Sequence, residues 1–106
     1  MVKDLSVATL LDTYGNMLTT RQRDVVGYYY CDDLSLAEIA ENEGITRQAV
    51  RDLIRRAVNQ LTEMEQKLGF AAKMQSVYAV AKDIRKAAEG CAASDIISLC
   101  DGLLKE

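Results

Sequence analysis

Residues 36–53, LAEIAENEGITRQAVRDL, decide the fold of this chain. Ala40 is small at the point where the second helix of a helix-turn-helix crosses the first, and Gly44 suits a tight left-handed turn. This spacing predicts a helix-turn-helix; the alternative is an ordinary corner of two helices that binds no nucleic acid. The apolar side chains expected to fill the wedge between the two helices are Ile39, Ile45, Val50 and Leu53.

Capping residues on both sides of this motif predict where the helices begin. A Ser or Thr followed three residues later by Gln or Glu forms a capping box, in which each side chain accepts a hydrogen bond from the other residue's backbone. Two such boxes are present, Thr19 with Gln22 and Ser35 with Glu38, and Thr46 caps a further helix. The sequence therefore predicts helices over residues 3–14, 20–31, 36–42 and 46–68.

Beyond the turn, apolar residues recur in alternating steps of four and three, which is a heptad pattern. Two such seams follow one another but are out of phase, which predicts a break at Gly69 and a separate helix over residues 70–89, ended by Gly90. Ser94 caps a last short helix. The first seam comprises Val50, Ile54, Ala57, Leu61, Met64 and Leu68, the second Phe70, Met74, Val77, Ala81, Ile84 and Ala88, and the last helix bears Ile96, Leu99 and Leu103.

These elements predict an all-α chain in two parts. Residues 1–68 hold an N-terminal helix, the helix-turn-helix and an extended recognition helix, and residues 69–106 form a helical extension of the same domain for packing or oligomerisation. The recognition helix is longer than a compact three-helix domain needs, so its distal part, residues 61–68, is expected to pack on a further surface. Apolar seams of this length would otherwise stay exposed, which predicts a homodimer.

Composition excludes several classes of protein. With 106 residues, the chain has room for one small domain, and 13 Lys and Arg against 16 Asp and Glu give a net charge of −3, which rules out a polybasic protein that binds nucleic acid by bulk charge. There is no histidine, and Cys31, Cys91 and Cys100 lack Cys-x-x-Cys spacing. We therefore expect no metal, no cofactor and no catalytic residue, and read the thiols as reduced cysteines of a cytoplasmic protein. No apolar run is long enough to span a membrane.

The outward face of the helix after Thr46 carries side chains suited to nucleic acid. Residues 46–60 contain four arginines and one aspartate, a local charge of +3. Arginine reaches guanine edges or phosphates, glutamine pairs with adenine, and a hydroxyl with free amides at a helix start meets a phosphate. The alternative is a solvated face on which Asp52 pairs with Arg56. The candidate nucleic-acid-binding residues are Thr46, Arg47, Gln48, Arg51, Arg55 and Arg56.

Other charged and aromatic residues have plainer interpretations. Residues 24–43 carry six acids and no base, and this local −6 would oppose DNA where the first helix of the motif crosses the backbone. Three consecutive tyrosines suggest base stacking. We expect Tyr29 and Tyr30, however, to lie on the core face together with Val26. Tyr28 is then the exposed ring. The acids Glu63 and Glu65 are expected to be helix-surface charges.

The sequence resembles the YlxM-like family of small bacterial helix-turn-helix proteins over most of its length. The likeness is carried by residues 12–14, 18–23, 34–40 and above all 46–56, TRQAVRDLIRR. Residues 18–61 are more broadly similar to sigma-factor region four. The family resemblance implies a role in the signal recognition particle pathway, because the family's genes lie beside those of the particle's GTPase. It also implies no catalytic residues, and nucleic-acid binding through Arg47, Gln48, Arg51, Arg55 and Arg56.

Two functions follow as hypotheses. The first is a non-enzymatic regulatory or accessory protein of the signal recognition particle pathway, which binds the particle's RNA, its protein, or both. The second is a transcriptional regulator that reads DNA with the helix after Thr46. Loss of site-specific duplex DNA binding on substituting Arg51 and Arg55 by alanine would support the second hypothesis.

Overall fold

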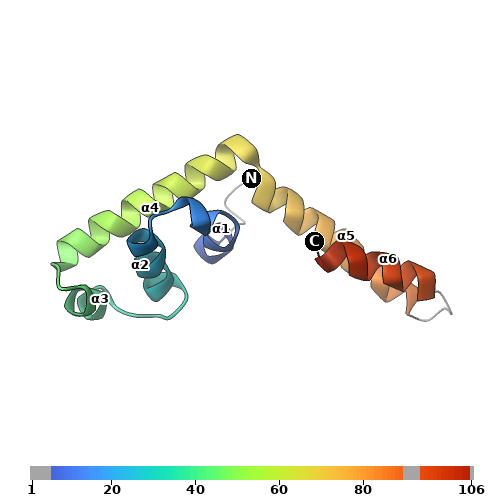
Figure 1. The fold of residues 1–106 in the computed structure, drawn as a ribbon, viewed down its shortest axis with the longest axis horizontal. Coiled ribbons are helices and arrows are strands. Elements are labelled where there is room, and N and C mark those ends of the chain that lie inside the picture. The colour runs from blue at the N-terminus through green and yellow to red at the C-terminus, as the bar shows by residue number, and fades with distance from the viewer. Residues whose placement is uncertain (1–5, 90–93, 106) are drawn as a thin grey trace. The chain divides into compact units, whose positions relative to one another are not determined.

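The fold is all-helical, as predicted. The computed structural model describes residues 6–89 and 94–105, and these residues form helices joined by turns (Figure 1). The chain divides into two compact units, residues 1–71 and 72–106. The elements are α1 (Val7–Tyr14), the short 3-10 helix η2 (Gly15–Met17), α2 (Thr20–Tyr30), α3 (Leu36–Glu43), α4 (Arg47–Leu68), α5 (Phe70–Ala88) and α6 (Ser94–Lys105).

The predicted capping residues Thr19, Ser35 and Thr46 each lie directly before the first residue of a helix in the first unit. Both capping boxes form: the Thr19 hydroxyl accepts from the Gln22 N–H at 3.1 Å, and the Ser35 hydroxyl accepts from the Glu38 N–H at 3.1 Å, each with the reciprocal bond. The Thr46 hydroxyl accepts from the Ala49 N–H at 3.0 Å. The first helix begins at Val7, and the part of its predicted range before Ser6 lies outside the described residues, as does Gly90.

A glycine in the left-handed region makes each of the two sharp turns at the ends of α4. Gly44, with φ +70°, ends α3, and the following Ile45 N–H bonds the Ala40 carbonyl at 3.1 Å. Gly69, with φ +60°, ends α4 at the predicted break, and its N–H bonds the Glu65 carbonyl at 2.7 Å. Side chains other than glycine rarely adopt this conformation, so these two positions fix where the long helix begins and ends.

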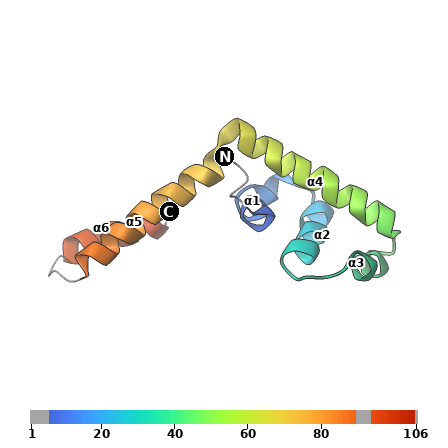
Figure 2. The same ribbon diagram turned by 180° about the vertical axis from the view of Figure 1, so that it is seen from behind.

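Within the first unit, α4 packs against α1, α2 and α3, which lie along one side of it (Figures 1 and 2). The core beside the turn contains Val25, Ile39, Ala40, Val50 and Ile54. Of the residues expected to fill the wedge, Ile39 and Val50 are completely buried, and Ile45 and Leu53 pack partly buried against them. The predicted helix-turn-helix packing is therefore confirmed.

The distal part of α4 packs on α1, which is the further surface that its length required. Leu61 is completely buried there, and Leu10 of α1 is nearly so. The first predicted seam holds as far as Leu61 but is wrong beyond it: Leu68 is 67% exposed, whereas Glu65, expected on the surface, is 3% exposed. Glu65 takes the inward position because Tyr14 of α1 supplies it with a hydrogen bond.

The second unit contains α6 and α5 from Ala72 onward, which lie side by side in both views (Figures 1 and 2). An ion pair between Arg85 and Asp101 joins the two helices. Ala81, Ala88 and Cys100 are buried, so small side chains allow the helices to approach closely. The second predicted seam is only partly inward: Ile84 is 42% exposed, and in the first unit Phe70 is 51% exposed.

Candidate nucleic-acid interface

All six candidate residues are exposed at the start or on the outer surface of α4, but they do not form one site. Five of them line two adjoining hollows on one flank of α4, facing the end of α2 and the start of α3. The sixth, Arg56, lines a separate hollow on the opposite flank with Thr19, Gln22 and Asp52. The five residues brought together are Thr46, Arg47, Gln48, Arg51 and Arg55.

The first hollow surrounds the N-terminus of α4. The Thr46 hydroxyl oxygen already accepts from the Ala49 N–H, and its own O–H stays able to donate to a phosphate oxygen. Gln48 is held in place by donating to the Asp52 carboxylate at 3.1 Å. The residues that line this hollow are Tyr29, Ser35, Leu36, Ala37, Thr46, Arg47, Gln48 and Arg51.

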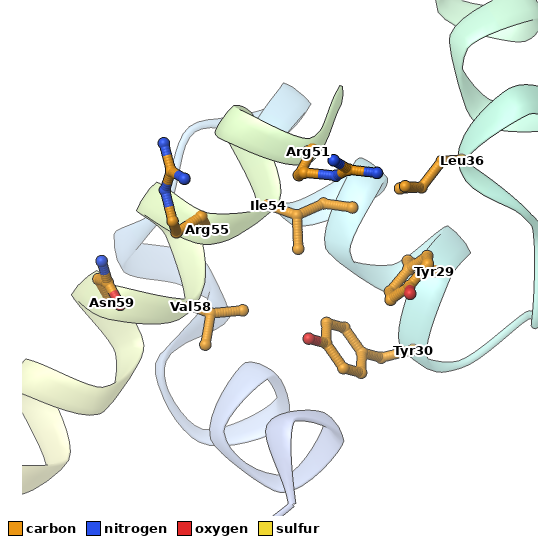
Figure 3. A pocket seen from close by; sticks show the side chains of 8 residues that line it. All are labelled: Tyr29, Tyr30, Leu36, Arg51, Ile54, Arg55, Val58 and Asn59. Carbon is orange, nitrogen blue, oxygen red and sulfur yellow. The ribbon is translucent and has the colours of Figure 1, made fainter. Parts of the chain in front are cut away.

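The second hollow, of about 310 Å³, continues the first along α4 and shares Tyr29, Leu36 and Arg51 with it (Figure 3). Ile54 and Val58 point toward the tyrosine rings, while Arg55 and Asn59 stand on the outer side of α4 (Figure 3). We call the two hollows together the arginine groove. The second hollow is lined by Tyr29, Tyr30, Leu36, Arg51, Ile54, Arg55, Val58 and Asn59.

The prediction for the tyrosines was wrong. Tyr28 packs partly buried against the core, whereas Tyr29 and Tyr30 are 38% and 41% exposed. Val25 and Val26 are both completely buried, but at the end of α2 only Tyr28, one turn after Val25, continues the inward stripe, and the two rings that follow Val26 by one turn face outward. Their ring centroids lie 5.0 Å apart at an interplanar angle of 84°, an edge-to-face pair.

The arginine groove is cationic because it contains three arginines and no carboxylate among its lining residues. Asp52 pairs with Arg55 at 2.9 Å, and not with Arg56 as the alternative interpretation required. An exposed i,i+3 ion pair of this kind contributes little stability, so the arginine can exchange its carboxylate for another anion. Within residues 6–89 and 94–105, neither Arg47 nor Arg51 has an ion pair or a side-chain hydrogen bond.

The six acidic side chains of residues 24–43 stay outside the arginine groove, although other residues of this segment line it. Arg21 pairs with Glu43 at 3.3 Å, which offsets part of the local negative charge. Glu38 is used in the capping box at the start of α3, where the backbone and side-chain hydrogen bonds of Ser35 hold its pKa below the ordinary value. None of the six acids lines either hollow.

Other kinds of site find little support in the part of the chain that the structure describes. No three His, Cys, Asp or Glu side chains gather there where they could hold a metal ion. Cys31 is exposed, Cys100 is buried and neither is in a disulfide, while Cys91 lies outside the described residues. Of the helices in residues 6–89 and 94–105, none combines the length and apolar character needed to cross a membrane.

Comparison with known proteins agrees with the helix-turn-helix geometry. Residues 1–99 match the model of the UPF0122 family of YlxM/p13-like helix-turn-helix proteins. A UPF0122 protein of Shouchella clausii is 40% identical over 102 residues, covering 96% of this chain and 91% of its own. Another, from Symbiobacterium thermophilum, is 51% identical over 75 residues, which is 70% of each chain. The chain therefore belongs to the YlxM/p13-like family of helix-turn-helix proteins.

Proposed function

We propose that the chain is a non-enzymatic regulatory or accessory protein that binds nucleic acid in the arginine groove. The observation that carries this proposal is the gathering of Arg47, Arg51 and Arg55 in a groove without a carboxylate, on a chain whose net charge is −3. Local concentration of cations against an acidic background serves recognition of a polyanion at one place. Thr46 and Gln48 add hydrogen-bonding groups at the helix start, where a phosphate or a base edge fits.

We further propose that this protein acts in the cytoplasm, in the signal recognition particle pathway, on the particle's RNA or its protein. The resemblance that suggested this pathway is supported by the family match over residues 1–99. The acidic segment before α4 favours RNA over long duplex DNA, because a duplex lying across the motif would meet that negative field. Binding of duplex DNA by a transcriptional regulator is the second candidate, since Arg47, Gln48 and Arg51 follow one exposed face of α4 as major-groove readers do.

The experiment measures binding of the particle's RNA and of a random duplex DNA library over a range of salt concentrations. Replacing Arg47, Arg51 and Arg55 together by alanine should weaken binding and reduce the slope of log K against log salt by roughly two for single-stranded nucleic acid and nearly three for a duplex, because three phosphate contacts are lost. Lys67→Ala is the matched control, as Lys67 is an exposed cation at the far end of α4. Equal salt slopes for the wild type and the triple variant would contradict the proposed site. Saturable, sequence-specific DNA binding without RNA binding would favour the regulator.

We also propose that the protein is a homodimer joined through α6. One stripe of α6 is buried or partly buried and comprises Ile97, Cys100 and Leu104. The apolar stripe predicted from the sequence lies on another side of the helix and is exposed. The short helix α6 thus has two apolar stripes, one buried within the chain and one exposed. The exposed stripe supports contact with a second copy of the chain. The exposed stripe comprises Ile96, Leu99 and Leu103, which are 45%, 75% and 43% exposed.

A further inference from the structure

The second hollow of the arginine groove has the wrong surface for a phosphate alone. Ile54, Val58 and Leu36 make an apolar floor, and Tyr29 and Tyr30 supply two half-exposed rings beside it. Its volume of about 310 Å³ lies at the lower end of the range of small-ligand sites, which is about 300–1,000 Å³. Such a hollow suits one flat, largely apolar group.

The rim of the same hollow favours a flat group that carries a negative charge. Arg51 belongs to both hollows and is free of ion pairs within the described residues, and Arg55 stands on the outer side of α4. Asn59 adds a side-chain amide that can both donate and accept. A nucleotide meets all of these requirements, because its base has an aromatic face and polar edge and its phosphate is anionic. An aromatic side chain of a protein partner would match the floor but would bring no anion to Arg51.

We propose that the second hollow binds a single unpaired base of the nucleic acid that occupies the arginine groove, stacked against Tyr29 or Tyr30. This inference rests on the proposed function and narrows its ligand. A base in a regular duplex is stacked and paired with its faces covered, so only a bulged, looped or single-stranded nucleotide can enter. The phosphates on either side of that base would then lie along Arg51 and the first hollow. The favoured ligand is therefore a structured RNA with an unpaired nucleotide.

The test compares two RNA hairpins that are closed by a non-nucleotide linker and differ by one nucleotide: one is fully paired, and the other carries a single bulged 2-aminopurine. The wild type should prefer the bulged hairpin and quench its fluorescence. Replacing Tyr29 and Tyr30 together by alanine should reduce affinity for the bulged hairpin by roughly 5- to 150-fold, the equivalent of about 1–3 kcal/mol per stacked base, and should restore fluorescence. Binding of the paired hairpin and its salt dependence should not change, because no arginine is altered.

Two further variants keep the result interpretable. The Tyr29→Phe, Tyr30→Phe double variant retains both rings and should keep the preference, which separates stacking from hydroxyl contacts. Phe70→Ala removes an exposed ring outside the groove and should have no effect. Far-UV circular dichroism checks that the alanine variant is folded.

The outcomes distinguish this inference from the function on which it rests. If the wild type binds both hairpins equally, or the alanine variant keeps the preference, the base site is wrong while the arginine groove stands. If the wild type binds neither hairpin at low salt, RNA binding in the arginine groove is wrong and the base site fails with it. Binding of an aromatic peptide that the tyrosine substitutions abolish, without any effect on RNA, would assign the hollow to a protein partner.

Discussion

The Tyr14 hydroxyl donates a hydrogen bond of 2.5 Å to Oε1 of Glu65, linking the end of α1 to the last turns of α4. The same carboxylate oxygen accepts from the Ala71 N–H at 3.0 Å, and the Tyr14 oxygen accepts from the Phe70 N–H at 3.2 Å. These are the first two amides of α5, which have no partner inside their own helix. One buried carboxylate thus fastens α1 to α4 and caps the helix that begins after Gly69.

Tyr14→Phe should lower the free energy of unfolding by about 1–3 kcal/mol, because a buried carboxylate loses a donor and the Phe70 N–H loses an acceptor. Urea unfolding followed by circular dichroism measures this change. Tyr30→Phe is the matched control, since the exposed Tyr30 has no side-chain hydrogen bond within the described residues. Equal losses in the two variants would contradict a specific role for the Tyr14 hydroxyl.

The pH dependence of the free energy of unfolding should also reveal the hydrogen bond between Tyr14 and Glu65. Burial, and next the hydrogen bond to Glu65, raise the pKa of Tyr14 above its ordinary value of 10.0. Because the folded state holds the proton more tightly than the unfolded state, the stabilisation is complete below about pH 10 and is lost as the pH rises through the folded pKa. The difference in unfolding free energy between the wild type and Tyr14→Phe should therefore shrink above about pH 10. A difference that stays constant from neutral to alkaline pH would contradict this assignment.

Most of the fold could be predicted from the sequence because its signals are local. Capping boxes at Thr19 and Ser35 and left-handed glycines at 44 and 69 are each decided by neighbours within a few residues. Glu65 could not be predicted in the same way. Its inward position depends on Tyr14, fifty-one residues earlier, and a carboxylate in an apolar seam otherwise reads as a surface charge.

The candidate interface could be predicted only in part, for a related reason. The residues of α4 were identified correctly as exposed because helical periodicity decides which side chains face outward. Their division into two flanks, with Arg56 separated from Arg51 and Arg55, depends on where α2 and α3 lie against α4. The place of Tyr29 and Tyr30 in the groove follows from the same tertiary packing.

Gly44→Ala should destabilise the first unit by about 1–2 kcal/mol. The methyl group itself meets no atom within 4 Å, so the cost comes only from the left-handed backbone at φ +70°. Gly102→Ala is the contrasting variant: Gly102 lies inside α6, also in open space, and alanine there should stabilise the helix by about 0.5–1 kcal/mol. Thermal unfolding of both variants tests the signs. A neutral Gly44→Ala would mean that the turn between α3 and α4 relaxes to another conformation.

Leu99→Asp should break the proposed homodimer. Leu99 is the most exposed residue of the outward stripe of α6, and burying a leucine is worth about 1.5–3 kcal/mol. In a two-fold dimer the residue counts twice, so the substitution should weaken association on the order of 100- to 10,000-fold, as measured by sedimentation equilibrium. Leu68→Asp is the matched control, because Leu68 is a comparably exposed leucine in the first unit and its replacement should leave the dimer intact. A wild-type protein that stays monomeric at the highest concentrations would contradict the proposed dimer.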